Sequence, residues 1–168
     1  MSQYQAGTLV VYGNLGVHEI EAVGPQSFCG EPAKEYYTLR PCFSDSHDHS
    51  YIPTAKEGAL RLVSSPGQAA DGLEKIQAEI LPAPVSSNQT VLAEHYQAMI
   101  HTNDFYEYLK LCKELCQKQN VQRSRGRKFN AMDSHFSQMV ERVLREELAV
   151  AFSEPLEAAD KRLKAAMQ

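Results

Sequence analysis

The spacing of apolar residues changes near residue 69, and this change constrains the fold more than any other feature of the chain. Before it, short runs such as Thr8–Tyr12 and Tyr36–Arg40 are rich in β-branched and aromatic residues and alternate as strands do. After it, apolar residues recur three and four positions apart, as on one face of a helix. We therefore predict an α+β protein, with a small antiparallel β-domain over residues 1–63 and an all-α bundle of about five helices over residues 68–168.

Turn-forming residues delimit the strands of the front part. The predicted strands cover residues 8–12, 17–23, 36–40, 50–52 and 60–63. Gly24 and Pro25 are expected to end the second strand, because proline cannot donate to a ladder. Strands this short suit a strongly twisted sheet or a half-open barrel, and such a small domain leaves a strand edge exposed.

Helical spacing places five helices in the back part. They are predicted near residues 73–80, 91–100, 105–116, 132–148 and 156–163. Asn103 and Ser153 are expected to be N-caps, since each precedes an acidic residue and a new apolar stripe. The stretch between the third and fourth helices contains Gly126 and is predicted to be a polar connector.

Charge is unevenly distributed along the chain. The formal net charge of −4 argues against a protein that coats nucleic acid by bulk electrostatics. No acidic residue lies between Glu114 and Asp133, yet five basic residues do: Lys118, Arg123, Arg125, Arg127 and Lys128. This segment is either a solvated face or a local patch that contacts DNA.

Membrane and export classes are not favoured. No apolar run approaches the roughly 20 residues that span a bilayer, and the N-terminus lacks the charged and apolar regions of a secretory signal. We therefore expect a cytoplasmic protein whose four cysteines are reduced thiols. These are Cys29, Cys42, Cys112 and Cys116.

No catalytic motif is convincing, so the sequence predicts neither an enzyme nor a cofactor. Glycine-rich phosphate loops, nucleophile elbows and His-Glu-x-x-His are all missing. The sharpest candidate is a zinc or nickel site built from Cys42, His47, Asp48 and His49. The alternative, a solvated hairpin tip without metal, is favoured because no second ligand pair follows. His95, Cys112 and Cys116 lie on apolar helix faces and are expected to be core residues.

Several segments, in this order and spacing, resemble the CarD family of bacterial transcription regulators, whose front module is shared with the transcription-repair coupling factor. In the front part these are Gly7–Val17, Ile20–Val23, Lys34–Pro41 and Tyr51–Thr54. In the back part they are Arg123–Arg145 and Glu146–Ala151, which are most similar to clostridial-type members.

The resemblance implies a concrete function. A Tudor-like N-terminal domain would dock on the β subunit of RNA polymerase, through a sheet edge near Gln26, Tyr51 and Ile52. The helical domain would touch promoter DNA at the upstream edge of the transcription bubble and stabilise the open complex without reading much sequence. The residues expected to contact DNA are Arg123, Arg125, Arg127, Lys128 and Gln89.

The chain departs from the family pattern at positions that often carry function. It contains no tryptophan, and Gln89 aligns with the tryptophan that many members wedge against the minor groove. Val91 and Leu92 replace arginines, and Gln26 and Tyr51 replace two basic residues that help grip polymerase. The leading hypothesis is thus a regulator bridging polymerase and promoter DNA. The alternatives are a polymerase-bound adaptor that has lost productive DNA contact and a metal-dependent enzyme.

Overall fold

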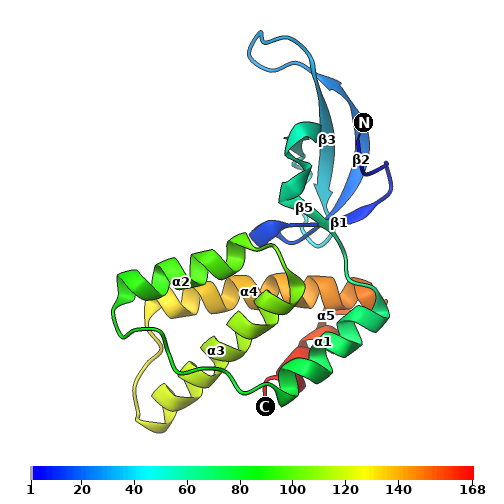
Figure 1. The fold of residues 1–168 in the computed structure, drawn as a ribbon. Coiled ribbons are helices and arrows are strands. Elements are labelled where there is room, and N and C mark those ends of the chain that lie inside the picture. The colour runs from blue at the N-terminus through cyan, green and yellow to red at the C-terminus, as the bar shows by residue number, and fades with distance from the viewer. Residues whose placement is uncertain (1) are drawn as a thin grey trace. The chain divides into compact units, whose positions relative to one another are not determined.

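The computed structural model describes residues 2–168, which form two compact units that divide after Val63 (Figure 1). The first unit is a five-stranded antiparallel sheet, and the second, Ser64–Gln168, is a bundle of five α-helices. The predicted α+β fold is therefore confirmed. Within residues 2–168, every helix is too short or too polar to span a bilayer.

The sheet of the first unit has the strand order β4-β3-β2-β1-β5. Its strands are β1 (Leu9–Tyr12), β2 (Val17–Gln26), β3 (Lys34–Pro41), β4 (Ser50–Pro53) and β5 (Leu60–Leu62). One face buries a small core made of Tyr4, Val10, Ile20, Tyr37, Leu39, Ile52 and Leu60. β4 and β5 are the two edge strands, so each has one side that no strand of this sheet covers.

β2 continues through Gly24 and Pro25, so the predicted break at these residues is wrong. β1 pairs with β2 only over residues 17–19, whereas β3 pairs with β2 as far as Gln26. The second half of β2 therefore has a strand on one side alone, which is where a proline is tolerated in a sheet. The result is a long β2–β3 hairpin (Figure 1).

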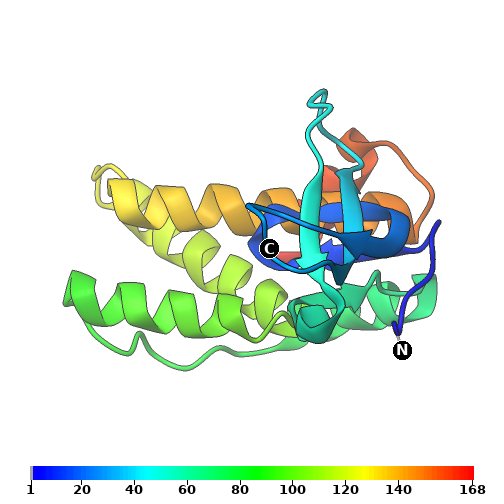
Figure 2. The same cartoon turned by 90° about the horizontal axis from the view of Figure 1, so that it is seen from above.

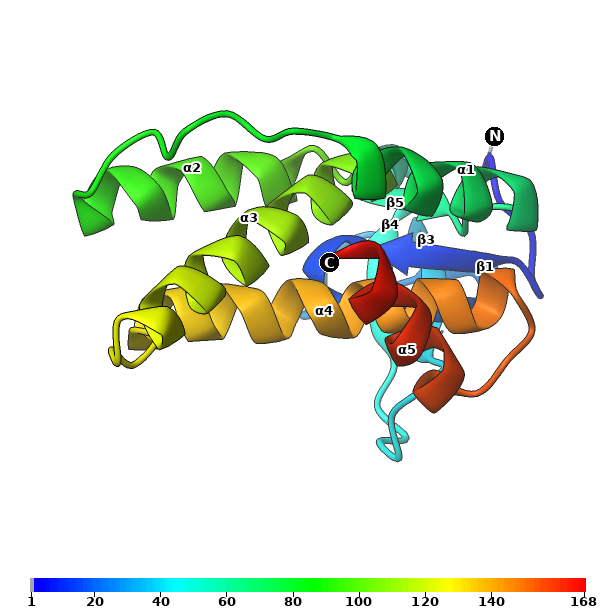
Figure 3. The same ribbon diagram turned by 90° about the horizontal axis from the view of Figure 1, so that it is seen from below.

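The second unit is built around its longest helix, α4. The helices are α1 (Pro66–Ala78), α2 (Gln89–His101), α3 (Phe105–Ser124), α4 (Ala131–Ala151) and α5 (Leu156–Ala166). α3 and α5 pack against α4, and α1 and α2 pack against α3 (Figure 3). Fully buried side chains at these contacts include Ile76, Tyr96, Leu109, Leu115, Leu144, Leu148 and Leu163.

The two predicted N-caps instead end the helices before them. Asn103 has a φ of 48° and follows the last residues of α2, while Ser153 has a φ of 50° and follows α4. Positive φ is typical of the residue that closes a helix C-terminus. Asp104 is the N-cap of α3, since its carboxylate accepts a hydrogen bond from the Glu107 amide at 2.9 Å. α5 begins after Pro155, without a side-chain cap.

α3 is longer than predicted, because it runs on through Ser124 instead of ending near Cys116. Its last eight residues are mostly glutamine, lysine and arginine, which have good helix propensity. Lys118 and Arg123 are therefore helical, and the connector to α4 covers only residues 125–130. This connector and the N-terminus of α2 lie at the same end of the bundle (Figure 2).

The chain enters the helical unit at a buried carboxylate. Glu147 is fully buried and accepts hydrogen bonds from the Ser64 amide at 2.9 Å and the Ser64 hydroxyl at 2.7 Å. Ser65 then caps α1, in a reciprocal capping box with Gln68. Ser64 and Ser65, the first residues of the second unit, are thus held within that unit by specific hydrogen bonds.

Candidate partner and nucleic-acid interfaces

Four exposed basic residues lie where α3 ends, and we call them the basic turn. They are Arg123, Arg125, Arg127 and Lys128. Gly126, with a φ of 67°, donates its amide to the Arg123 carbonyl at 3.0 Å, and the Arg127 amide reaches the Gln122 carbonyl at 2.9 Å. This pair of bonds is a Schellman motif, which fixes the backbone as it leaves the helix. The cationic side chains therefore project from an ordered scaffold.

Lys118, the fifth residue of the predicted basic segment, is committed elsewhere. Its ammonium group lies 2.6 Å from the carboxylate of Asp133, which is fully buried. The Tyr96 hydroxyl, at 2.9 Å, and the Asn130 side-chain amide, at 2.7 Å, donate to the same carboxylate. Burial, and then the hydrogen bond to Asp133, raises the pKa of Tyr96, so its hydroxyl remains a donor. This Asp133 cluster joins α2, α3 and α4 next to the basic turn.

Gln89, the remaining predicted DNA contact, is exposed at the start of α2. It lines a cavity of about 540 Å³ together with Arg125. Arg123 lines a different cavity of about 510 Å³, together with Phe129 and Lys164. The structure thus brings Gln89 and Arg125 to one cavity, while Arg123 lines the other.

Three rings, of which two are exposed and one is half-buried, lie together on the outer face of the sheet near β4, and we call them the aromatic cluster. The Phe28 ring lies 5.1 Å from the Tyr36 ring and 5.2 Å from the Tyr51 ring, measured between centroids. Phe28 is 39% exposed and Tyr51 is 43% exposed, although both are large apolar side chains. Exposed aromatic groups of this kind mark interaction surfaces more often than isolated apolar residues do.

The other two residues predicted to bind polymerase lie differently from Tyr51. Ile52 follows Tyr51 in β4, and its side chain, 4% exposed, belongs to the sheet core on the opposite face. It can therefore offer a partner only its backbone. Gln26 is exposed at the far end of β2, opposite Lys34, two residues before Phe28.

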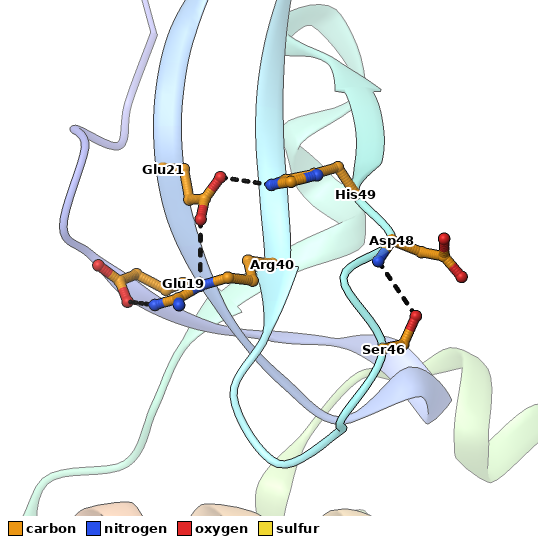
Figure 4. A network of polar contacts seen from close by, with 6 residues as sticks. All are labelled: Glu19, Glu21, Arg40, Ser46, Asp48 and His49. Carbon is orange, nitrogen blue, oxygen red and sulfur yellow. Dashed lines mark hydrogen bonds and ion pairs between the residues drawn. The ribbon is translucent and has the colours of Figure 1, made fainter.

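A network of charged side chains accompanies the aromatic cluster on the sheet (Figure 4). A register shift in β2 makes Glu21 a bulge residue, and its carboxylate contacts Arg40 at 3.1 Å and His49 at 2.6 Å. Arg40 also pairs with Glu19 at 2.7 Å. The carboxylate of Asp48 points away from this network, as Figure 4 shows.

The residues of the metal hypothesis do not gather into a ligand set. His49 is paired with Glu21, and the Asp48 amide donates to the Ser46 hydroxyl at 3.1 Å. Across residues 2–168 no three histidine, cysteine or acidic side chains come together in a way that could hold a metal ion. Cys42 is exposed at the end of β3.

Of His95, Cys112 and Cys116, which were predicted to be core residues of the helices, only Cys112 is buried. Cys112 is buried, and burial raises the pKa of its thiol well above the usual range. Cys116, predicted to be equally buried, is only half-buried. His95 is only partly buried, and its ring nitrogen lies 3.0 Å from the Glu114 carboxylate.

Two features of these surfaces escaped the sequence-based prediction. Phe28 lies in the loop that joins β2 to β3, and its ring meets Tyr51 only because this hairpin is folded. In the sequence, Asp133 was noted only as the acidic residue at the end of the basic segment. In the structure its carboxylate accepts a hydrogen bond from the hydroxyl of Tyr96, 37 positions away. The one available signal was Asn130, a good N-cap three residues before an acidic side chain.

Comparison with known proteins adds no assignment. No protein-family model matches the chain, and no curated protein matches it.

Proposed function

We propose that the protein is a bacterial transcription regulator. It docks on the β subunit of RNA polymerase through its β unit and contacts promoter DNA, without reading its sequence, through its helical unit. It acts in the cytoplasm, bound to polymerase on the nucleoid, and changes the stability of the open complex. The resemblance to the CarD family supplies the identity of both partners, and the two surfaces described above support the contacts.

The observation that carries the proposal is the aromatic cluster beside the open edge of β4. An edge strand offers unpaired backbone donors and acceptors to an extended segment of another protein. Next to that edge, Phe28 and Tyr51 expose apolar surface that would be desolvated on docking. Backbone pairing then supplies the contact, and the rings take the place of the two basic family residues that align with Gln26 and Tyr51.

DNA contact is assigned to the basic turn because its four cations have no acidic neighbour in the sequence. Arginine and lysine bind phosphates irrespective of the bases, so the contact is non-specific and sensitive to salt. With a net charge of −4, the protein as a whole repels DNA at long range. Binding by the free protein is therefore weak.

Docking on polymerase compensates for this weak affinity. Once the β unit is bound, the basic turn meets DNA in an effectively intramolecular step, at an effective concentration that can reach about mM. A long flexible linker would dilute this effect. Because Ser64 is bonded to Glu147 within the helical unit, Val63 is the one residue of the chain that lies between β5 and that unit.

A second candidate function is a polymerase-bound adaptor without productive DNA contact. It is favoured by the first turn of α2, where Gln89 and Val91 are exposed and Leu92 is buried. This turn carries no cation. The two candidate functions differ in whether the basic turn contacts promoter DNA or remains solvated.

The lifetime of a promoter open complex distinguishes them. We expect the wild-type chain to change this lifetime, and Tyr51→Glu to abolish the effect although the basic turn is intact. Neutralising all four residues of the basic turn to glutamine should also abolish it. An effect that survives the fourfold neutralisation supports the adaptor, and one that survives Tyr51→Glu contradicts docking through the aromatic cluster.

A further inference from the structure

The cavity shared by Gln89 and Arg125 is lined by the start of α2 and the end of α3. These two helix ends lie at the same end of the bundle (Figure 3). Its apolar lining comes from both helices and from the segment before α2, and consists of Leu81, Pro82, Pro84, Leu92 and Val121. Val121 is 47% exposed although it is apolar. A volume of about 540 Å³ falls within the range of about 300–1,000 Å³ that is typical of small-molecule sites.

The polar groups of the cavity are of two kinds. Lys118 and Glu114 are already paired, with Asp133 and His95 respectively. By contrast, the side-chain amides of Gln89, Gln117 and Gln122 and the guanidinium of Arg125 have no side-chain partner in the part of the chain that the structure describes. Each amide offers a donor and an acceptor, the combination that hydrogen-bonds the edge of a nucleobase.

We propose that this cavity takes an unpaired base of a DNA strand whose phosphates lie along the basic turn. This inference rests on the proposed function and specifies the form of DNA that the helical unit prefers. The apolar side chains cover the face of the base, the glutamine amides meet its edge, and Arg125 pairs with a phosphate. A free nucleotide would need only the charge of Arg125. Arg127 and Lys128 are exposed and do not line the cavity, so they add positive charge for the phosphates of a longer strand.

The base must be unpaired before it binds. Extracting a base from a duplex costs a few kcal/mol, which enzymes recover largely by stacking the base on aromatic rings. Tyr96 is the sole aromatic residue that lines the cavity among residues 2–168, and it is fully buried with its hydroxyl committed to Asp133. The cavity therefore captures bases that are already exposed, as in a transcription bubble.

Binding of the full chain to two labelled DNAs tests this inference. One is a 20-base-pair duplex and the other is the same duplex with a short central bubble, both at low salt. We expect the wild-type protein to bind the bubble about tenfold more tightly, because the face of the base would cover apolar surface that is otherwise exposed to water, such as Val121. Val121→Met extends a longer side chain into the cavity without adding an aromatic ring, and it should reduce this preference while duplex binding, through the basic turn, is retained. The matched control is Val91→Met, because Val91 is similarly exposed, at 43%, but does not line the cavity.

Each outcome separates the inference from the proposed function. Equal binding of duplex and bubble by the wild-type protein, or a preference that is unchanged in Val121→Met, overturns the inference and leaves non-specific DNA contact standing. An equal reduction of the preference in Val91→Met overturns the assignment to this cavity. Binding to neither DNA overturns both proposals. Competition by a free mononucleotide at micromolar concentration overturns the choice of a strand as the ligand.

Discussion

Replacing Asp133 with alanine should destabilise the helical unit more than any surface substitution. Asp133 is fully buried and receives the Tyr96 hydroxyl, the Asn130 amide and the Lys118 ammonium at 2.6–2.9 Å. Alanine leaves the buried Tyr96 hydroxyl without an acceptor, which costs about 1–3 kcal/mol. The Lys118 side chain is 26% exposed, so its ammonium group can reach water when Asp133 is removed. Loss of this ion pair therefore adds less than the roughly 3–5 kcal/mol that is typical of breaking a fully buried pair. We expect a total of about 3 kcal/mol.

Urea unfolding followed by far-UV circular dichroism measures this loss, because the helices dominate the signal. Asp133→Asn keeps an acceptor for Tyr96 and should cost about half as much. Asp160→Ala is the control, since Asp160 pairs with Arg145 and Lys164 in partly exposed positions, where an ion pair is worth about 1 kcal/mol or less. If Asp133→Ala destabilises the protein no more than Asp160→Ala, the cluster does not hold α2, α3 and α4 together.

Two local contacts and one buried thiol can each be tested by a single experiment. Glu147→Gln replaces the buried carboxylate that accepts the two Ser64 hydrogen bonds by a neutral amide, and it should lower the free energy of unfolding in urea by about 1–2 kcal/mol. The backbone amide of Ser64 should then exchange its hydrogen faster; an unchanged exchange rate would contradict the role of Glu147 in holding Ser64. Gly126→Ala places a side chain at a φ of 67° and should cost about 1 kcal/mol in the same assay, whereas a stabilised variant would contradict the Schellman motif. Cys112, whose raised pKa keeps it a thiol, should react with a thiol reagent at pH 8 far more slowly than the exposed Cys29; equal rates would show that α3 opens readily.

The fold could be predicted from local patterns, because alternation and helical spacing each report burial within one element. The misplaced boundaries have a common cause. Asn103 and Ser153 suit either an N-cap or the closing residue of a helix, and the backbone of the preceding helix decides between these roles. Similarly, Pro25 fits within β2 only because β1 does not extend beside it.

The candidate surfaces could be predicted only where they are contiguous in sequence. The basic turn was visible in the sequence as a run without acidic residues. Lys118 does not belong to it, because it forms an ion pair with Asp133, which lies fifteen residues later on the neighbouring helix α4. The aromatic cluster joins a loop residue to two strands, and no periodic pattern links Phe28 to Tyr51. Long-range pairings of this kind depend on the fold and not on spacing.

Direct binding to the RNA polymerase β subunit tests the central claim. The measurement is the affinity of the full chain for the purified β subunit, for the wild-type protein, Tyr51→Glu and Leu62→Glu. Leu62 is the matched control because it is 58% exposed on β5, the edge strand at the other side of the sheet. The account predicts binding by the wild-type protein, a loss of at least about tenfold for Tyr51→Glu, as for a central interface residue, and little change for Leu62→Glu. No binding by the wild-type protein, or equal losses in both variants, would contradict docking through the aromatic cluster and the edge of β4.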